Sequence, residues 1–316
     1  MADYFATFIT GCQEIIGKRL NAFANNQLQV RQLYDGLVVF QSSLSSNQLS
    51  ELRLFNNVYT LLADGQGDPA TLQLPAPRLH GTFLVRVSEQ GQPAPVPNDL
   101  RDHIALQSGA DFTAHRPDNE FLLLKRSDGH WFWGIMLPRA GFKQRRIEAG
   151  ELSPQLAHIL ALVAGLDAKD AVLDPFAGYG GIVREALQGF HAKEVIAVEE
   201  NEHLVPHLKS IPHLVALHGD ARQLAHVQTR SIDRIITDPP WGEFATMPQP
   251  ELHKLYVHAF FQMHRVLRTK GAVVMLAAVP FMAQAAAEGG FAITHQYPIL
   301  VAGHKATIYK LRKLNQ

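Results

Sequence analysis

The sequence predicts an α/β protein with two units, an N-terminal α+β region followed by a doubly wound, mostly parallel sheet. The chain has 316 residues, about twice the usual length of one domain. From Gly150 onward, short apolar strands alternate with helical segments, a pattern typical of a parallel sheet covered by helices. Before Gly150 the strands are joined by turns and short helices, which indicates α+β organisation.

Composition excludes several protein classes. Hydrophobic residues make up 47% and charged residues 18%, which argues against a disordered chain. Lys plus Arg and Asp plus Glu both number 29, so a nucleic-acid partner must be met by a local patch. The single cysteine, Cys12, cannot form an internal disulfide or a thiolate metal cage. The longest apolar run, 272–281, is far shorter than the roughly 20 residues of a membrane helix, and we expect a cytoplasmic protein without membrane contact.

The N-terminal region is predicted to contain five strands and two helices. The turn Ser127-Asp128-Gly129 makes a hairpin of the last two strands, and the Gly/Pro-rich stretch 65–77 is predicted to be a loop. Alternation and helical spacing give strands at 4–9, 36–40, 82–87, 120–126 and 130–137, and helices at 12–23 and 47–55.

The C-terminal half begins after a boundary at 138–150. The predicted helices are 154–164 and 181–188, and the predicted strands are 171–174, 194–199, 214–218, 234–237, 272–279, 291–297 and 304–311. The last two strands form a terminal hairpin, which suits the antiparallel edge of an otherwise parallel sheet.

A glycine-rich turn, Leu173 to Gly181, lies between a predicted strand and a helix. Glycines let the chain turn sharply and let a ligand approach the backbone, and the following helix presents its first amides. Such a turn can also be purely structural. No Gly-Lys-Ser/Thr follows, which argues against a nucleoside triphosphate.

Acidic residues end the successive strands. Asp174 ends the first strand, and Glu199, rather than its neighbour Glu200, is placed to accept hydrogen bonds from a ribose diol. Asp220, after the third strand, could bind an adenine amino group. Each alone would more often cap a helix, but together they predict a ligand site at the carboxyl edge of the sheet.

The fourth strand ends in Asp238-Pro239-Pro240-Trp241. Proline lacks an N–H, so this turn is stiff and rich in carbonyl groups. Asp238 and the Pro239 carbonyl can accept both protons of a planar exocyclic amine, which makes its nitrogen more nucleophilic, and Trp241 offers a face for an unstacked base. The alternative is a proline-rich turn with a buried Trp.

These motifs resemble class I S-adenosylmethionine-dependent methyltransferases, and most of the chain is similar to the THUMP-linked tRNA guanosine N2-methyltransferases that act at position 10. The resemblance implies a seven-stranded Rossmann-like methyltransferase domain with an N-terminal α+β RNA-binding region. It divides the chain into a ferredoxin-like subdomain (1–75), a THUMP-like subdomain (76–137), a basic linker (138–150) and the methyltransferase domain (151–316).

The resemblance also implies roles for individual residues. Family members commonly carry Cys where Ala177 stands, and Tyr or Phe where Trp241 stands. The implied catalytic residues are Asp238, Pro239, Pro240 and Trp241. The implied residues for S-adenosylmethionine are Asp174, Pro175, Phe176, Ala177, Gly178, Gly180, Glu199, Asp220 and Ala221.

The predicted activity is methyl transfer to the exocyclic N2 amine of a guanosine in structured RNA, with tRNA as the first choice. Two alternatives stay open: N6-adenine methylation of RNA or DNA, and a non-catalytic RNA-binding protein with a vestigial fold. The basic linker is expected to contact RNA phosphates through Arg139, Lys143, Arg145 and Arg146. The alternative is that these charged side chains only face solvent. We expect no metal site. The resemblance raises a small zinc-binding activator protein as a partner.

Overall fold

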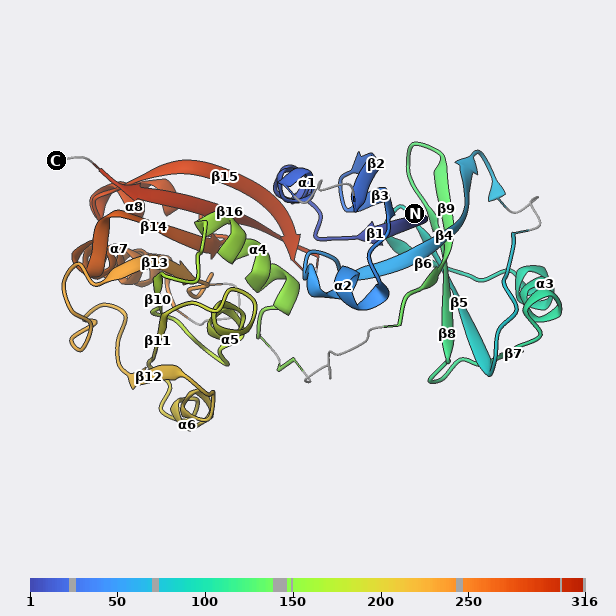
Figure 1. Ribbon diagram of the computed structural model, residues 1–316. Coiled ribbons are helices and arrows are strands. Elements are labelled where there is room, and N and C mark those ends of the chain that lie inside the picture. The colour runs from blue at the N-terminus through green and yellow to red at the C-terminus, as the bar shows by residue number, and fades with distance from the viewer. Residues whose placement is uncertain are drawn as a thin grey trace. The chain divides into compact units, whose positions relative to one another are not determined.

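The computed structural model describes residues 1–22, 27–69, 74–138, 147–148, 150–242, 247–301 and 303–314. The chain divides into two compact units. The first comprises residues 1–8 and 16–143, and the second comprises residues 9–15 and 144–316. Figure 1 shows the elements of both units, coloured along the chain.

In the described part of the first unit, one sheet has the strand order β2-β3-β1-β4-β9-β8-β5-β6, and β7 pairs with β5. The predicted hairpin is confirmed, because β8 and β9 pair antiparallel with Leu123 opposite Trp133. The strands of this region are β1 (Ala2–Thr7), β2 (Leu28–Tyr34), β3 (Leu37–Ser42), β4 (Asn57–Gln66), β5 (Thr82–Glu89), β6 (Gln92–Ala94), β7 (Asp111–Phe112), β8 (Asn119–Lys125) and β9 (His130–Met136). Its helices are α1 (Gln13–Ala22), α2 (Ser46–Glu51) and α3 (Asn98–Ser108).

The N-terminal region differs from the sequence prediction in several elements. Strands β2, β4, β6 and β7 and helix α3 were not predicted. Strand β4 runs into the stretch predicted as a loop, because Gly65 lies against the indole of Trp131, where a Cβ atom would be 2.7 Å from Cζ2. Helix α2 ends at Glu51 rather than Phe55, and Arg53 then has a left-handed φ of 54°. The division at residue 75 stays a prediction.

In the described part of the second unit, seven strands form a sheet in the order β12-β11-β10-β13-β14-β16-β15. The first five run parallel, whereas β16 is antiparallel to β14 and to β15. The predicted Rossmann-like sheet with an antiparallel terminal hairpin is therefore confirmed. Its elements are α4 (Pro154–Ala164), β10 (Ala171–Asp174), α5 (Gly181–Gln188), β11 (Glu194–Glu199), α6 (Val205–Lys209), β12 (Leu214–His218), β13 (Ile232–Thr237), α7 (Gln249–Val266), β14 (Leu267–Ala277), α8 (Met282–Glu288), β15 (Phe291–Val301) and β16 (His304–Lys313).

The strand order reverses between β10 and β13. From β10 the chain builds outward through β11 and β12, then returns to place β13 on the other side of β10. Open α/β sheets bind ligands at such a switch point, beyond the carboxyl ends of the strands. This topology fixes where a site of the second unit is expected.

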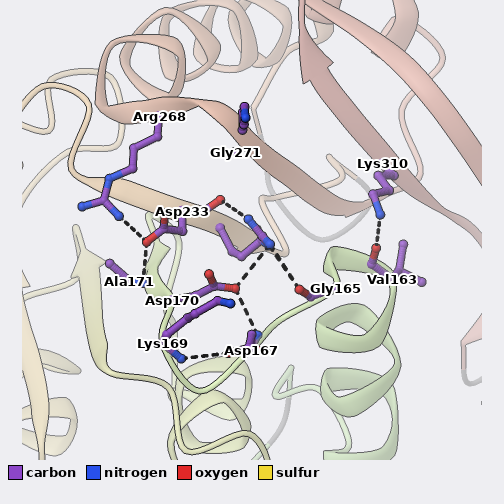
Figure 2. A network of polar contacts seen from close by, with 12 residues as sticks. Val163, Gly165, Asp167, Lys169, Asp170, Ala171, Asp233, Arg268, Gly271 and Lys310 are labelled. Carbon is purple, nitrogen blue, oxygen red and sulfur yellow. Dashed lines mark hydrogen bonds and ion pairs between the residues drawn. The ribbon is translucent and has the colours of Figure 1, made fainter.

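At the opposite edge of the same sheet, where the parallel strands begin, polar contacts connect neighbouring elements (Figure 2). Asp233 Oδ2, on β13, accepts a hydrogen bond from the Ala171 N–H of β10 at 3.0 Å and another from Arg268 Nη1 at 2.5 Å. Lys310 Nζ donates to the Val163 carbonyl of α4 at 2.7 Å. The network joins two central strands at their starts and connects β16 to the end of α4.

Candidate active site

Four acidic residues lie at the carboxyl ends of four neighbouring parallel strands. Asp174 is the last residue of β10 and Glu199 the last of β11, whereas Asp220 follows β12 and Asp238 follows β13. Because these strands are adjacent and parallel, their ends share one edge of the sheet. The structure thus places the predicted acids together, at the switch point.

The glycine-rich loop connects β10 to α5 around this edge. Gly180 has a φ of +85°, a left-handed conformation that favours glycine, and a Cβ atom there would lie 2.9 Å from Ile211 Cδ1. Gly178 has a φ of +52° and no atom within 4 Å of its would-be Cβ. Backbone next to open space is what a ligand needs for close approach. Of the other predicted loop residues, Pro175 and Ala177 are buried and Phe176 is partly buried.

Asp174 is fully buried and joins the loop to the neighbouring strand. Its Oδ1 accepts hydrogen bonds from Thr237 Oγ1 at 2.7 Å and from the Phe176 N–H at 3.1 Å. The pKa of Asp174 is raised to about 7, mainly by burial and to a smaller extent by the nearby carboxylates of Asp238 and Glu199, while the two hydrogen bonds act to lower it. Thr237 was not predicted as a site residue, yet it links the ends of β10 and β13.

Glu199 holds the glycine-rich loop in place. Its Oε2 accepts from the Gly178 N–H at 2.7 Å, and its Oε1 accepts from the Asn201 N–H at 2.8 Å. Each carboxylate oxygen offers two acceptor positions, so one at each oxygen remains for a ligand hydroxyl pair. The predicted role of Glu199 is therefore compatible with its contacts.

Asp220 is bound by its own neighbour. Arg222 Nε donates to Oδ1 at 2.9 Å and to Oδ2 at 2.8 Å, and the Arg222 N–H donates to Oδ1 at 2.7 Å. Burial raises the pKa of Asp220, but these hydrogen bonds outweigh it and the net pKa lies below the ordinary value. Asp220 is thus a carboxylate at neutral pH, and Ala221 beside it is buried.

The turn after β13 positions Asp238 against an indole. Trp241 Nε1 donates to Asp238 Oδ1 at 2.8 Å, and Tyr256 Oη donates to the Pro240 carbonyl at 2.9 Å. Burial raises the pKa of Asp238 to about 7, although the Trp241 hydrogen bond lowers it. Pro239 is buried and Pro240 exposed. The hydrogen bond from Tyr256 attaches the turn to helix α7.

Comparisons with known proteins show what this part of the chain is similar to. Residues 207–302 match the RMKL-like methyltransferase domain. This segment includes Asp220 and the Asp238 turn, which are half of the strand-end acids described above.

Two curated relatives match part of the chain. The tRNA (guanine(10)-N2)-dimethyltransferase of Methanothermobacter thermautotrophicus is 31% identical over 134 residues, which cover 40% of this chain and 39% of the relative. The enzyme of the same description from Pyrococcus abyssi is 30% identical over 129 residues, covering 39% and 38%. The matches thus span well under half the length of these curated relatives.

Solved structures share the fold over the whole chain. TrmN from Thermus thermophilus superposes with a TM-score of 0.79 at 21% identity, covering 99% of this chain and 100% of TrmN. A candidate methyltransferase complexed with SAH superposes with a TM-score of 0.70 at 14% identity, covering 100% of this chain and 99% of the other. These similarities establish that the chain has a methyltransferase fold.

Tyr256 of the methyltransferase domain was missed because helix α7 was not predicted. The helix carries buried Leu252, Leu255, Tyr256, Ala259, Phe260 and Met263, and this i, i+3, i+4, i+7 spacing is the signal of an amphipathic helix. Burial raises the pKa of Tyr256 far above its ordinary value, so its hydroxyl remains a donor to Pro240.

Other predictions concern features outside this edge. The linker residues Arg139, Lys143, Arg145 and Arg146 lie outside the described residues. Among the residues that are described, no group of three His, Cys, Asp or Glu side chains could hold a metal ion, and no helix has the length and hydropathy needed to cross a membrane.

Proposed function

We propose that this protein transfers a methyl group from S-adenosylmethionine to the N2 amine of a guanosine in tRNA. The observation that carries the proposal is the Asp238-Pro239-Pro240-Trp241 turn beside the glycine-rich loop at the switch point of a methyltransferase fold. The base and the RNA class rest on the two curated relatives, which are described as tRNA (guanine(10)-N2)-dimethyltransferases.

The residues at the carboxyl edge fit the cofactor. The space beside Gly178 admits a ligand against the backbone, the acceptor positions of Glu199 suit a ribose diol, and ionised Asp220 suits an adenine amine. When bound, S-adenosylmethionine supplies an electrophilic methyl group on a sulfonium. We assign its methionine end to Asp174 and the loop, its ribose to Glu199 and its adenine to Asp220 and Ala221.

Asp238 and Pro239 would prepare the amine for attack. The lone pair of an exocyclic amine is delocalised into the base, and this delocalisation falls when both N–H groups donate to fixed acceptors. Asp238 Oδ2 and the Pro239 carbonyl are such acceptors, and the indole face of Trp241 would support the unstacked base. Positioning and polarisation then carry the catalysis.

Proton balance assigns a second task to Asp238. Transfer of the methyl group to the amine nitrogen would leave a neutral thioether and a nitrogen that must lose one proton. Asp238, with a pKa raised to about 7, accepts that proton near neutral pH more readily than an exposed carboxylate would.

We infer further that the N-terminal region, with its predicted ferredoxin-like and THUMP-like subdomains, docks the RNA and that the basic linker contacts phosphates. An electrostatic contact of this kind weakens as salt increases. Alanine at Arg145 and Arg146 should therefore raise KM for RNA and flatten its salt dependence, without changing affinity for S-adenosylhomocysteine.

The decisive experiment is methyl transfer from labelled S-adenosylmethionine into separate pools of unmodified tRNA, rRNA and duplex DNA. Nucleoside mass analysis of the product identifies the base. We expect N2-methylguanosine from the tRNA pool alone. N6-methyladenine would replace the proposed base with adenine, and cofactor binding without labelling of any pool would refute the proposed substrates.

A matched pair of variants tests the assigned residues. Glu199→Gln keeps the shape of the side chain but weakens its interaction with a diol, and it should lower affinity for S-adenosylhomocysteine measured by calorimetry. Asp238→Ala should leave that affinity unchanged and abolish transfer. Retained turnover in Asp238→Ala would remove Asp238 from the mechanism.

A further inference from the structure

Three of the four strand-end carboxylates accept a hydrogen bond from the backbone two residues ahead. Asp174 accepts from the Phe176 N–H at 3.1 Å, Glu199 from Asn201 at 2.8 Å, and Asp220 from Arg222 at 2.7 Å. This local turn is common for acidic side chains. It stabilises the carboxylate and occupies one of its acceptor positions.

Asp238 cannot form this contact. The next two residues are Pro239 and Pro240, and proline has no N–H to donate. Among the described residues, the hydrogen bond that Asp238 accepts comes from a side chain instead, from Trp241 Nε1 to Oδ1 at 2.8 Å. The second oxygen, Oδ2, has no protein donor in that part of the chain.

The turn that makes this contact is anchored at its centre. Tyr256 Oη donates to the Pro240 carbonyl at 2.9 Å, and the Tyr256 ring packs edge-on against Phe281 with centroids 5.5 Å apart. Two prolines with fixed φ angles and one anchored carbonyl leave the turn little freedom. The indole three residues after Asp238 is thereby held within reach of its carboxylate.

We propose that Trp241 is a positioning residue for Asp238: its indole N–H holds Oδ1, while the two prolines withhold backbone donors so that Oδ2 stays open to the substrate amine. This inference rests on the proposed function and adds a second task to the residue expected to stack on the base. A phenylalanine at position 241 would provide the stacking face without the N–H.

The first test uses the indole N–H as a reporter. The chain has three tryptophans, and Trp133 Nε1 donates to the Pro75 carbonyl, which does not titrate. In protein labelled with ¹⁵N-tryptophan, the indole cross-peak that is lost in Trp241→Phe should move with pH, with a midpoint near neutrality. That movement should be absent in Asp238→Asn. A Trp241 cross-peak whose position is the same in wild type and in Asp238→Asn at every pH from 4 to 9 would overturn the contact.

The second test separates positioning from stacking by kinetics. Trp241→Phe should lower kcat by roughly 10- to 100-fold, the range for a lost hydrogen bond to a charged group, and leave KM for RNA within about threefold, since the stacking face is kept. The acidic limb of its pH–kcat profile should move to higher pH, because the carboxylate has lost its donor. Unchanged affinity for S-adenosylhomocysteine shows that the variant is folded.

Pro240→Ala tests the role of the prolines by adding a hydrogen-bond donor, whereas Trp241→Phe removes one. It restores a backbone N–H two residues after Asp238, so the acidic limb should move to lower pH; an unchanged limb would overturn that role. If wild-type protein shows no turnover while the Trp241 cross-peak titrates, the proposed function fails and the contact stands. If wild type is active and Trp241→Phe matches it in kcat and pH profile, the positioning role fails and the proposed function stands.

Discussion

Replacing Asp238 by Asn should stabilise the methyltransferase domain above neutral pH while abolishing methyl transfer. Asn is isosteric, and its Oδ1 can still accept the Trp241 indole hydrogen bond that Asp238 accepts at 2.8 Å. It cannot carry the negative charge whose burial raises the pKa of Asp238 to about 7. The substitution therefore removes a destabilising charge and keeps the local packing.

The direction of the pH dependence follows from proton linkage. The folded state holds the Asp238 proton more tightly than the unfolded chain, in which the pKa is near its ordinary value of 3.8. Stability is therefore complete below about pH 4 and falls as pH rises to about 7. Each unit of difference between the two pKa values corresponds to about 1.4 kcal/mol, which gives an upper limit of ~4 kcal/mol above pH 7. Asn removes this loss.

The assay is urea unfolding read by pulsed hydrogen exchange on peptides that cover β10 and β13, which reports the methyltransferase domain separately from the N-terminal region. Wild type and Asp238→Asn should have their closest midpoints at pH 3.5, diverge as pH rises from about 4 to 7, and differ by a nearly constant amount from pH 7 to 8. A difference that is the same at pH 3.5 and at pH 8 would show that the carboxylate is not destabilised by burial, and the reasoning about its pKa would fail.

Three other substitutions examine the loop and its support. Thr237→Val removes the donor to Asp174 and should cost about 1–3 kcal/mol in unfolding free energy, whereas Thr237→Ser should retain most of it. Gly180→Ala combines a φ of +85° with a Cβ atom crowded by Ile211, Leu208 and Val183, so denaturant unfolding should show a larger loss of stability than for Gly178→Ala. Gly178→Ala enters open space and should lose only about 1 kcal/mol, but calorimetry should show at least tenfold weaker binding of S-adenosylhomocysteine. Equal affinities in the two glycine variants would contradict ligand approach at Gly178.

The observed strands of the second unit agree closely with the predicted ones, because they are short apolar runs with clear ends. The strand at 194–199 has the predicted bounds, and the acid at its end is set by strand polarity alone. Helix α7 was not predicted although its apolar spacing is regular, because the prolines and polar residues around 240–250 are more typical of a loop than of the start of a helix. The N-terminal strand β4 (Asn57–Gln66) was not predicted, and its last two residues fall in the stretch predicted as a loop; the packed indole of Trp131 explains the glycine inside that strand.

The contacts within the site were less predictable than its position. Sequence periodicity places Asp174, Glu199, Asp220 and Asp238 on one edge, but not their partners. The Thr237 hydroxyl that reaches Asp174 spans 63 positions along the chain, and the Tyr256 hydroxyl that reaches Pro240 comes from a helix beneath the turn. Such contacts depend on how neighbouring strands and helices pack, which no local pattern records.

The two edges of the parallel sheet have opposite electrostatic designs. At the amino edge, Asp233 is paired with Arg268 and Asp170 with Arg234, so charge is balanced where the strands begin (Figure 2). At the carboxyl edge Asp220 is paired with Arg222, but in the described part of the chain no Lys, Arg or His forms an ion pair with Asp174, Glu199 or Asp238. The folded chain tolerates two carboxyl groups with pKa values near 7 there, at a loss of stability that a purely structural edge would not require. An excess of negative charge suits a cationic sulfonium, and a carboxylate that takes up a proton near pH 7 suits an amine that must release one.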